Sequence, residues 1–356
     1  MGKKNVVWSL IAVLIAVLTV WAIMSGTKNF SIESFTKYLK SCNPCWLVVA
    51  FGLMFLYILF EGLAVLRVCK GLGYKGRFKD GLLYSSADIY FSAITPSATG
   101  GQPACAFFMI RDGLPTPVTT VALLLNLVMY TASIMVLGLF AIIAKPALFY
   151  NFNSFTKLLI CLGYLILTLV GVFIILLIKK ESILHSLCEW GIKVLGHFKF
   201  IKHPEKLRIR LDKATAEYKE CSEMLFNRKK VMLEAFLLNL IQRVCQILIP
   251  AAVYMSMGAK LKDAFDVYVT QIFVTIGSNC LPVPGAMGVS DYLLIDGLRD
   301  RMTEVLATNM ELLSMGISFY ISVIFCLAVV IVGYVKRAGK KKIRIRKIII
   351  RKDKLD

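Results

Sequence analysis

A single positive charge in the middle of an apolar run is the feature of this sequence best suited to bind an anion. The run spans Val231 to Tyr254 and contains Asn239, Gln242, Arg243 and Gln246. Counted from Asn239, the other three fall at i+3, i+4 and i+7, so all four share one helical face. A lipid-facing charge near the middle of a span costs at least about 2.5 to 3.5 kcal/mol on insertion scales. This face is therefore predicted to point into the protein.

The guanidinium group of Arg243 has two alternative roles. It can bind an anionic ligand inside a helix bundle, because a guanidinium donates paired hydrogen bonds to phosphate and carboxylate oxygens. It can instead tie helices together through backbone carbonyls or through a carboxylate such as Glu61 or Asp88. Ionisable residues inside a membrane are functional by default, which favours the ligand.

The segment from Ser92 to Arg111 is apolar but cannot form a straight membrane helix. Pro96, Gly100, Gly101 and Pro103 fall within eight positions, and proline and glycine both disfavour helix interiors. In hydrocarbon a broken backbone survives only where protein buries it or where it lines a wet cavity. We therefore expect a re-entrant element, the usual construction of a transporter substrate site; a surface loop between two short helices is the alternative.

A second break follows in the apolar region from Val267 to Leu298. Its centre, Asn279 to Gly288, contains Pro282, Pro284 and Gly285. Each broken region consists of an apolar segment, a Pro/Gly break and a second apolar segment, and each finishes in the tripeptide Asp-Gly-Leu. If the two hairpins open to opposite sides, the chain contains an inverted repeat in which two half-helix tips meet near the midplane.

The two breaks and the polar face together define a candidate substrate site. Its residues are Thr95, Pro96, Gly100, Gly101, Gln102, Arg111, Asn239, Gln242, Arg243, Pro282, Pro284, Gly285, Gly288 and Asp291, with Glu61 and Asp88 as candidate charge partners. Backbone N–H groups at half-helix tips and a guanidinium both favour anions. The predicted spans contain no histidine and no carboxylates at metal-binding spacing, so we expect no catalytic residue, no metal and no cofactor.

Composition indicates the class of protein that must position these residues. Hydrophobic residues make up 58% of the chain and the mean hydropathy is +0.71, above the roughly 45 to 50 per cent apolar content of soluble domains. The formal net charge of +20 is distributed between apolar runs rather than gathered in one basic domain. We therefore expect the charge to face anionic lipid headgroups, with no nucleic acid bound.

Six apolar runs are long enough to cross a bilayer as helices. They are residues 6–24, 45–66, 118–143, 158–178, 231–254 and 310–335. With re-entrant segments near 82–111 and 267–298, they predict an all-α polytopic membrane protein with two membrane halves, 1–178 and 231–335. A basic linker at 179–230 and a basic tail at 336–356 lie between and after these halves.

The basic segments predict the orientation of the chain. Thirteen lysines and arginines lie between Lys179 and Lys230, and eleven lie between Lys336 and Lys354. By the positive-inside rule these segments and both termini are cytoplasmic. Within the linker, residues 206–226 alternate charged and apolar side chains without becoming apolar enough to insert, which predicts a helix along the membrane surface.

Two motifs resemble those of the lysylphosphatidylglycerol synthase membrane-domain family. The first is Thr95-Pro96-Ser97-Ala98-Thr99-Gly100-Gly101-Gln102-Pro103 with a following Arg111-Asp112-Gly113, which is similar to the family's T-P-x-x-x-G-G-Q-P signature. The second runs from Pro282 to Asp291 and is similar to P-x-P-G-G-x-G-x-x-E. It departs from the family pattern at Ala286, where a glycine is usual, and at Asp291, where a glutamate is usual. With the hydropathy pattern, the resemblance covers roughly residues 5 to 340.

The resemblance implies a function in lipid transport. In that family the membrane domain forms the N-terminal half of the multiple peptide resistance factor, where it is regarded as a flippase for aminoacylated phosphatidylglycerol. A soluble C-terminal domain makes that lipid from aminoacyl-tRNA. The present chain shows no pattern for such a domain, so the resemblance implies a stand-alone, multi-pass form in a bacterial cell membrane.

Three function classes follow. The first is a flippase that translocates an anionic or aminoacylated phospholipid, such as lysyl-phosphatidylglycerol. The second is a lipid-modifying enzyme, the membrane part of a phosphatidylglycerol lysyltransferase linked to antibiotic and cationic-peptide resistance, with Glu61, Asp88 and Asp291 as acid and base. The third is a scaffold for a separate lipid-aminoacylating synthase, and an oligomer is compatible with each. A nucleophile or metal cluster is missing from the predicted spans, which favours transport.

Overall fold

The computed structural model describes residues 32–95, 98–197, 204–279, 288–337 and 346–347. Its elements are α2 (Ile32–Ser41), α3 (Pro44–Gly71), β1 (Tyr74–Lys75), α4 (Phe78–Ile94), α5 (Gly101–Arg111), α6 (Thr116–Ala144), α7 (Pro146–Asn151), α8 (Ser154–Lys179), α9 (Glu181–His197), α10 (Pro204–Phe226), α11 (Lys229–Met255), α12 (Leu261–Ser278), α13 (Val289–Leu298), α14 (Glu304–Met315), the π-helix η3 (Gly316–Ile321), α15 (Ser322–Arg337) and β2 (Arg346–Lys347). The short strands β1 and β2 pair antiparallel. The predicted all-α polytopic class is confirmed.

Five helices of the described chain are long and apolar enough to cross a membrane. They are Pro44–Gly71, Thr116–Ala144, Ser154–Lys179, Lys229–Met255 and the continuous helix Glu304–Arg337 formed by α14, η3 and α15. Each contains the whole of one predicted run. The run at 6–24 lies outside the described residues, so the sixth span stays a prediction.

Helix caps fix where two of the spans begin. The Asn43 side chain accepts the Cys45 N–H at 2.9 Å, and Pro44 occupies the first turn of α3. The Asn153 side chain accepts the Thr156 N–H at 2.7 Å at the start of α8. A capping side chain satisfies an N–H that has no partner within the helix. The capping residues Asn43 and Asn153 therefore determine where α3 and α8 begin.

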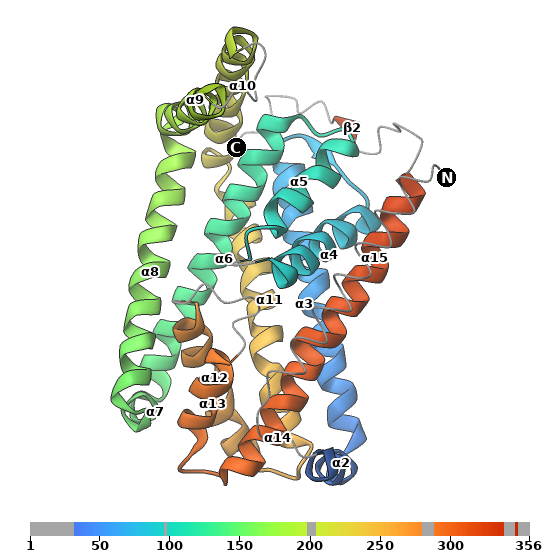
Figure 1. Ribbon diagram of the computed structural model, residues 1–356, viewed down its shortest axis with the longest axis vertical. Helices are drawn as coiled ribbons and strands as arrows, with labels where there is room; N and C mark the ends of the chain where they lie inside the picture. The colour runs from blue at the N-terminus through green and yellow to red at the C-terminus, as the bar shows by residue number, and fades with distance from the viewer. Residues whose placement is uncertain (1–31, 96–97, 198–203, 280–287, 338–345, 348–356) are drawn as a thin grey trace.

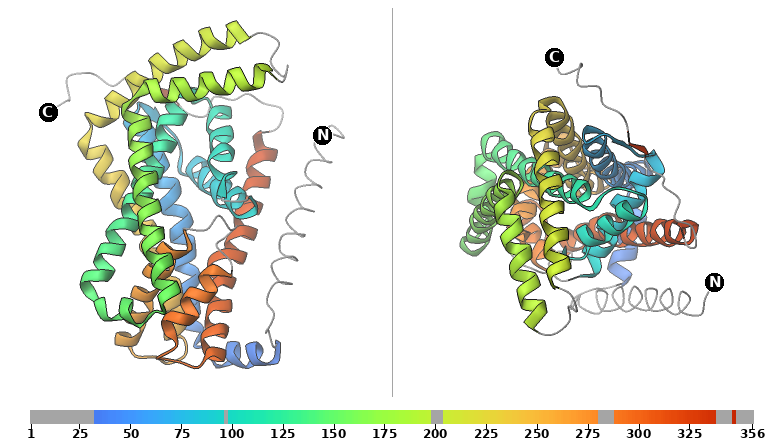
Figure 2. Two further views of the ribbon diagram at one scale, coloured as in Figure 1. Left: turned by 60° about the vertical axis from the view of Figure 1, so that its left-hand side comes forward. Right: turned by 90° about the horizontal axis from the view of Figure 1, so that it is seen from above.

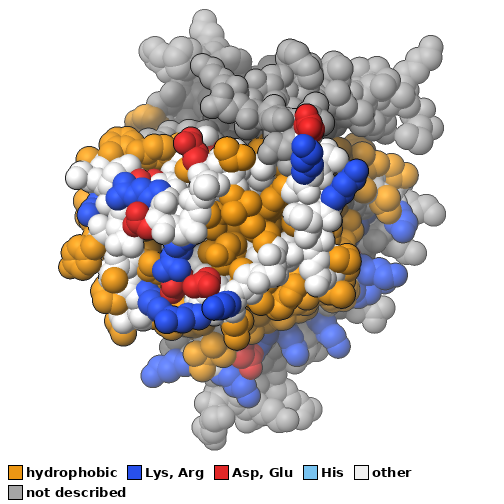
Figure 3. Space-filling view, turned by 90° about the horizontal axis from the view of Figure 1, so that it is seen from below, with side chains coloured by type: hydrophobic (Ala, Val, Ile, Leu, Met, Phe, Trp, Pro, Cys, Tyr) orange, Lys and Arg blue, Asp and Glu red, His pale blue; other side chains and the backbone are white. Residues whose placement is uncertain are grey.

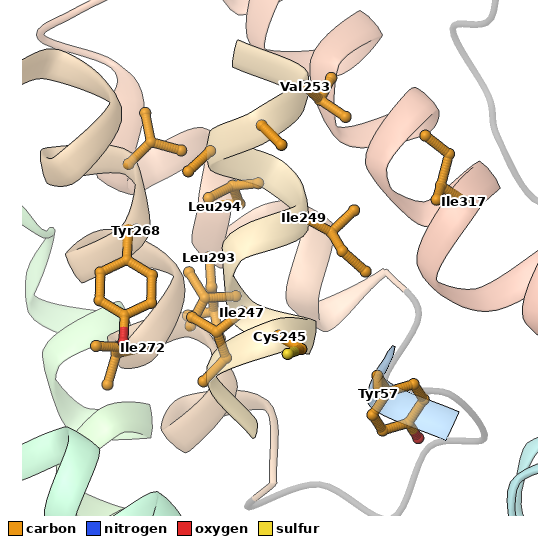
Figure 4. Close-up of a cluster of buried hydrophobic side chains, with 14 of the residues drawn as sticks. Tyr57, Cys245, Ile247, Ile249, Val253, Tyr268, Ile272, Leu293, Leu294 and Ile317 are labelled. Carbon is orange, nitrogen blue, oxygen red and sulfur yellow. The ribbon is translucent and has the colours of Figure 1, made fainter. Parts of the chain in front are cut away.

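Helices α3 and α11 pack along each other through the centre of the bundle (Figure 1). In the half of the bundle away from α9 and α10, α11 contributes Ile249 and Val253 to a buried apolar cluster. This cluster also receives side chains from α12, α13 and η3, including Ile272, Leu293 and Ile317 (Figure 4). Such a core holds α11 at a fixed rotation, and this rotation decides where the polar face of α11 points.

Two broken hairpins lie at opposite ends of the bundle. Helices α4 and α5 pack against each other toward the end that carries α9 and α10, and α12 and α13 pack against each other toward the other end (Figure 1). This placement agrees with hairpins that open to opposite sides. The inverted repeat and the meeting of both tips stay predictions, because residues 96–97 and 280–287 lie outside the described chain.

Helices α9 and α10 form a pair across one end of the bundle (Figure 2). The Tyr218 hydroxyl of α10 donates to the Leu177 carbonyl of α8 at 3.0 Å, and burial raises the pKa of this hydroxyl to about 12. Tyr218 therefore stays protonated as a donor and anchors α10 to the spans.

At the end of the bundle opposite α9 and α10, apolar side chains fill a hollow that polar and charged side chains surround (Figure 3).

Candidate functional site

Arg243 is buried inside the bundle, with 6% of its surface exposed. Its guanidinium carbon lies 4.0 Å from the ring centroid of Tyr130 and 5.5 Å from that of Tyr57. Its Nε donates to the Gln242 Oε1 at 3.2 Å, and its Nη1 donates to the Gln246 Oε1. Within the described chain it forms no ion pair with a carboxylate. Aromatic faces and neutral amides thus hold this charge, and both kinds of group attract a cation without neutralising it.

A pair of carboxyl groups lies next to this arginine. The Glu61 Oε2 accepts the Gln242 Nε2–H at 3.2 Å, and the Glu61 and Asp88 side chains are within hydrogen-bonding contact of each other. Both carboxyl groups also interact electrostatically with the positive charge of Arg243.

The first hairpin is joined to the same carboxyl pair. The Gln102 Nε2 of α5 donates to the Asp88 Oδ2 at 2.7 Å, and the Ser92 hydroxyl donates to the Asp88 Oδ1 at 3.2 Å. A chain of polar contacts therefore runs from α11 through α3 and α4 to α5. We call it the Arg243 cluster, consisting of Tyr57, Glu61, Asp88, Ser92, Gln102, Tyr130, Gln242, Arg243 and Gln246.

Within the described chain, the candidate charge partners Glu61 and Asp88 lie close to Arg243 without a hydrogen bond to its guanidinium. The guanidinium hydrogen-bonds to Gln242 and Gln246 instead, and Gln242 bridges to Glu61. Asn239, one turn earlier on α11, is 1% exposed and donates to the Asn126 Oδ1 of α6 at 3.0 Å. Asn239 thus ties α11 to α6, whereas the rest of the predicted polar face belongs to the cluster.

Glycine is required at the start of α5 by packing within the hairpin. The Thr95 hydroxyl accepts the Gly100 N–H at 2.9 Å and donates to the Phe91 carbonyl at 2.6 Å, which closes the break. A Cβ at Gly101 would lie 2.0 Å from both the Asp88 Oδ1 and the Ser92 Oγ. Any side chain here would separate α5 from α4. Pro96, another predicted site residue, lies outside the described residues.

Arg111 lies away from the cluster, at the far end of α5. Its Nη2 donates to the Arg337 carbonyl at 2.7 Å, and its guanidinium carbon lies 5.2 Å from the ring centroid of Tyr334. The structure therefore places Arg111 with α15 at the open end of the first hairpin, where α4 begins and α5 ends; we call this end the mouth of the hairpin. It is not brought together with Arg243.

The second break contributes a separate pair of acids. Gly288 has φ +75° and its N–H donates to the Asp291 Oδ2 at 3.2 Å, which begins α13. The Asp291 and Glu311 side chains contact each other, and Glu311 of α14 is 3% exposed. The predicted site residues Pro282, Pro284 and Gly285 lie outside the described residues.

The predicted site omitted Ser92 and Gln246 of the cluster, and sequence reasoning missed Tyr57, Tyr130 and Glu311 altogether. Tyr57 lies one turn before Glu61 on α3, and Tyr130 lies one turn after Asn126 on α6. Helical spacing from a polar residue could have pointed to both tyrosines. Glu311 is an acid inside the apolar run at 310–335, which is itself a signal for an inward-facing functional residue.

Comparison with known proteins gives two matches. The family described as the lysylphosphatidylglycerol synthase TM region matches residues 9–326. A UPF0104 membrane protein from Archaeoglobus fulgidus is 23% identical over 289 residues, which cover 79% of this chain and 84% of that protein. The family match includes every residue of the Arg243 cluster.

Proposed function

This chain belongs to the family of the lysylphosphatidylglycerol synthase TM region, and we propose that it moves an anionic or aminoacylated phospholipid between the two leaflets of a membrane. The observation that carries the proposal is the Arg243 cluster. A guanidinium is buried among spans and held by aromatic rings and amides, without an ion pair to a described carboxylate. A lipid phosphate would supply the anion that this group can bind.

The geometry of the guanidinium supports a phosphate ligand. Desolvating a cation costs several kcal/mol, and an anion in direct contact offsets part of this cost. The amide oxygens of Gln242 and Gln246 fix the orientation of the guanidinium plane. A pre-oriented guanidinium loses less conformational entropy when it makes paired hydrogen bonds to phosphate oxygens.

The neighbouring carboxyl pair extends the proposal to aminoacylated lipid. A lysyl-phosphatidylglycerol headgroup carries one phosphate and two ammonium groups. In our proposal Arg243 binds the phosphate, and Glu61 with Asp88 accepts hydrogen bonds from an ammonium group. The hydrogen bonds from Gln102 and Gln242 hold these two carboxyl groups in place.

A leaflet assay in proteoliposomes tests the proposal. Labelled phosphatidylglycerol, its lysyl ester and a neutral glycolipid are placed in one leaflet, and their appearance in the other is followed over time. We expect both phospholipids to move faster than in empty vesicles, and the glycolipid to move no faster. Arg243→Gln should abolish this difference, whereas Lys37→Gln, at a side chain that is 76% exposed, should leave it unchanged.

The result that would overturn the proposal is no transfer of either phospholipid by folded wild-type protein. Mass spectrometry of the same lipids tests the enzyme alternative, which the contact between Glu61 and Asp88 favours, because adjoining carboxyl groups can act as general acid and base. A protein-dependent change in lipid mass would support that alternative. Copurification with a synthase, without lipid movement by this chain, would support a scaffold.

A further inference from the structure

Helix α9 leaves the bundle at the level where a lipid-exposed span ends. It begins at Glu181, directly after α8, which ends at Lys179. The last turns of α8 expose apolar side chains, including Phe173 and Leu176. These exposed side chains place the end of α8 at the boundary of the hydrocarbon layer. The chain then turns, and α9 runs across the end of the bundle (Figure 2).

One face of α9 is covered by α10. The Glu181 Oε1 accepts the Lys219 Nζ–H at 2.7 Å, and the His185 Nε2 lies 2.9 Å from the Asp212 Oδ1. The hydrogen bond with Lys219 lowers the pKa of the Glu181 carboxyl, so this pair stays ionised at neutral pH. Glu181 and His185 are one turn apart and mark the polar face of α9.

The opposite face of α9 is apolar and partly exposed. Ile183, Leu187 and Trp190 are spaced at i, i+4 and i+7, and they lie roughly 180° around the helix from Glu181 and His185 at 100° per residue. Leu187 is 46% exposed and Trp190 is 66% exposed. We call these three residues the apolar stripe. A shallow hollow lined in part by Ile183 and Leu187 lies along the same side.

The position of α10 decides where the apolar stripe points. The outer part of α10 lies beyond α9, on the side away from the spans (Figure 2), whereas the other end of α10 packs against the protein through the buried side chains of Tyr218 and Leu225. The stripe, on the side of α9 away from α10, therefore faces the level of the membrane. This orientation favours α9 as a membrane-contacting helix of the linker, next to the surface helix predicted at residues 206–226.

We propose that α9 lies in the headgroup layer of the adjoining leaflet, with Leu187 and Trp190 inserted among the lipids. Tryptophan favours this interfacial layer, because its ring is apolar and its N–H is polar. Lys180, just before α9, is exposed, and so is Lys193, which also pairs with Glu189 at 3.4 Å; basic residues at this level are attracted to an anionic membrane surface. The occupant is therefore a bilayer surface that contains anionic lipid, on the side that the positive-inside rule makes cytoplasmic.

Fluorescence quenching tests this placement independently of lipid transport. The protein is reconstituted in vesicles of phosphatidylcholine and phosphatidylglycerol, with bromine on the acyl chains either near the headgroup or near the chain end. Subtracting the signal of Trp190→Phe isolates Trp190 from the other three tryptophans. We expect headgroup-proximal bromine to quench Trp190 at least roughly twofold more than chain-end bromine, and the membrane to shield Trp190 from aqueous acrylamide.

Two variants separate membrane contact from other causes of shielding. Leu187→Glu should reduce the bromine quenching of Trp190 and increase quenching by acrylamide. Lys213→Glu, at an exposed position on α10, is the matched control and should change neither. In vesicles of phosphatidylcholine alone, bromine quenching should fall, because the lysines lose their anionic partners.

Three results would overturn the proposal. The first is free access of acrylamide to Trp190 in vesicles without bromine quenching, which would place the stripe in water. The second is shielding from acrylamide without bromine quenching, which would indicate that a protein surface covers the stripe. The third is equal bromine quenching with and without phosphatidylglycerol, which would exclude the anionic lipid as the partner.

Discussion

At the scale of single residues, the buried cation of Arg243 is held without a direct counter-charge. Tyr57 and Tyr130 present their ring faces to the guanidinium, and Gln242 and Gln246 accept its hydrogen bonds. A merely structural arginine would more commonly be paired with one of the nearby carboxylates, since a buried unpaired charge is costly. This arrangement leaves the positive charge available to an anion.

Arg243→Lys should reduce lipid movement at least about tenfold, which corresponds to about 1.4 kcal/mol. A lysine keeps the charge but loses the planar fork and the stacking on Tyr57 and Tyr130. Initial rates in proteoliposomes measure the effect, and thermal unfolding in detergent reports on folding. Arg77→Lys, at a side chain that is 69% exposed, is the control. Wild-type transport by a well-folded Arg243→Gln protein would disprove the role.

Gly101→Ala should destabilise the first hairpin by about 1 to 3 kcal/mol, because its Cβ would lie 2.0 Å from atoms of Asp88 and Ser92. The clash would also break the hydrogen bond from Gln102 to Asp88, so transport should fall with stability. Gly52→Ala on α3 is the matched control, since a Cβ there meets no atom within 4 Å. Equal unfolding temperatures for the two variants would contradict the packing argument.

At the scale of elements, each hairpin is held at its mouth by ion pairs. At the first mouth, Arg337 of α15 lies 2.8 Å from the Asp80 Oδ1 and 2.6 Å from the Asp112 Oδ2. At the second, Lys145, between α6 and α7, lies 3.1 Å from the Asp266 Oδ1, and Asp296 accepts the Asn153 N–H at 2.9 Å. In each case the partner is an element outside the hairpin. The ion pairs therefore fix how each hairpin sits against the spans.

Arg337→Met should destabilise the protein by about 3 to 5 kcal/mol, because it leaves the buried carboxylates of Asp80 and Asp112 without their cation. Unfolding in detergent measures this loss. The triple variant that adds Asp80→Asn and Asp112→Asn should recover part of it. Arg299→Gln, at a side chain that is 48% exposed, is the comparison and should cost no more than about 1 kcal/mol. A small effect of Arg337→Met would show that the first mouth does not depend on this contact.

At the scale of the whole molecule, charge is distributed unequally between the two ends of the bundle. The linker with α9 and α10 and the end of α15 share one end, and the turn between α11 and α12 lies at the other (Figure 1). If the basic end is cytoplasmic, the first hairpin opens toward the cytoplasm and the second opens outward. Alternating exposure of the Arg243 cluster would then require one half to move against the other.

Cysteine labelling tests this orientation. In a cysteine-free background, Lys213→Cys on α10 should stay unlabelled by a membrane-impermeant maleimide in intact cells, because α10 lies at the basic end. Lys262→Cys, exposed at the start of α12 at the other end, should be labelled. Permeabilised cells, in which both positions should react, are the control. The reverse pattern would invert the topology.

The sequence by itself determined the class of the protein and the five spans that the structure describes. It also determined where the two hairpins interrupt their helices and that the polar face of α11 points into the protein. These follow from the transfer free energy of apolar runs and from the backbone limits of proline and glycine, which act over a few neighbouring residues. Only the tertiary structure decided which side chains meet. Tyr57, Asp88, Tyr130 and Arg243 come from four helices, and Arg111 was separated from them by the length of α5. Such contacts depend on the rotation and register of packed helices, which no local pattern specifies.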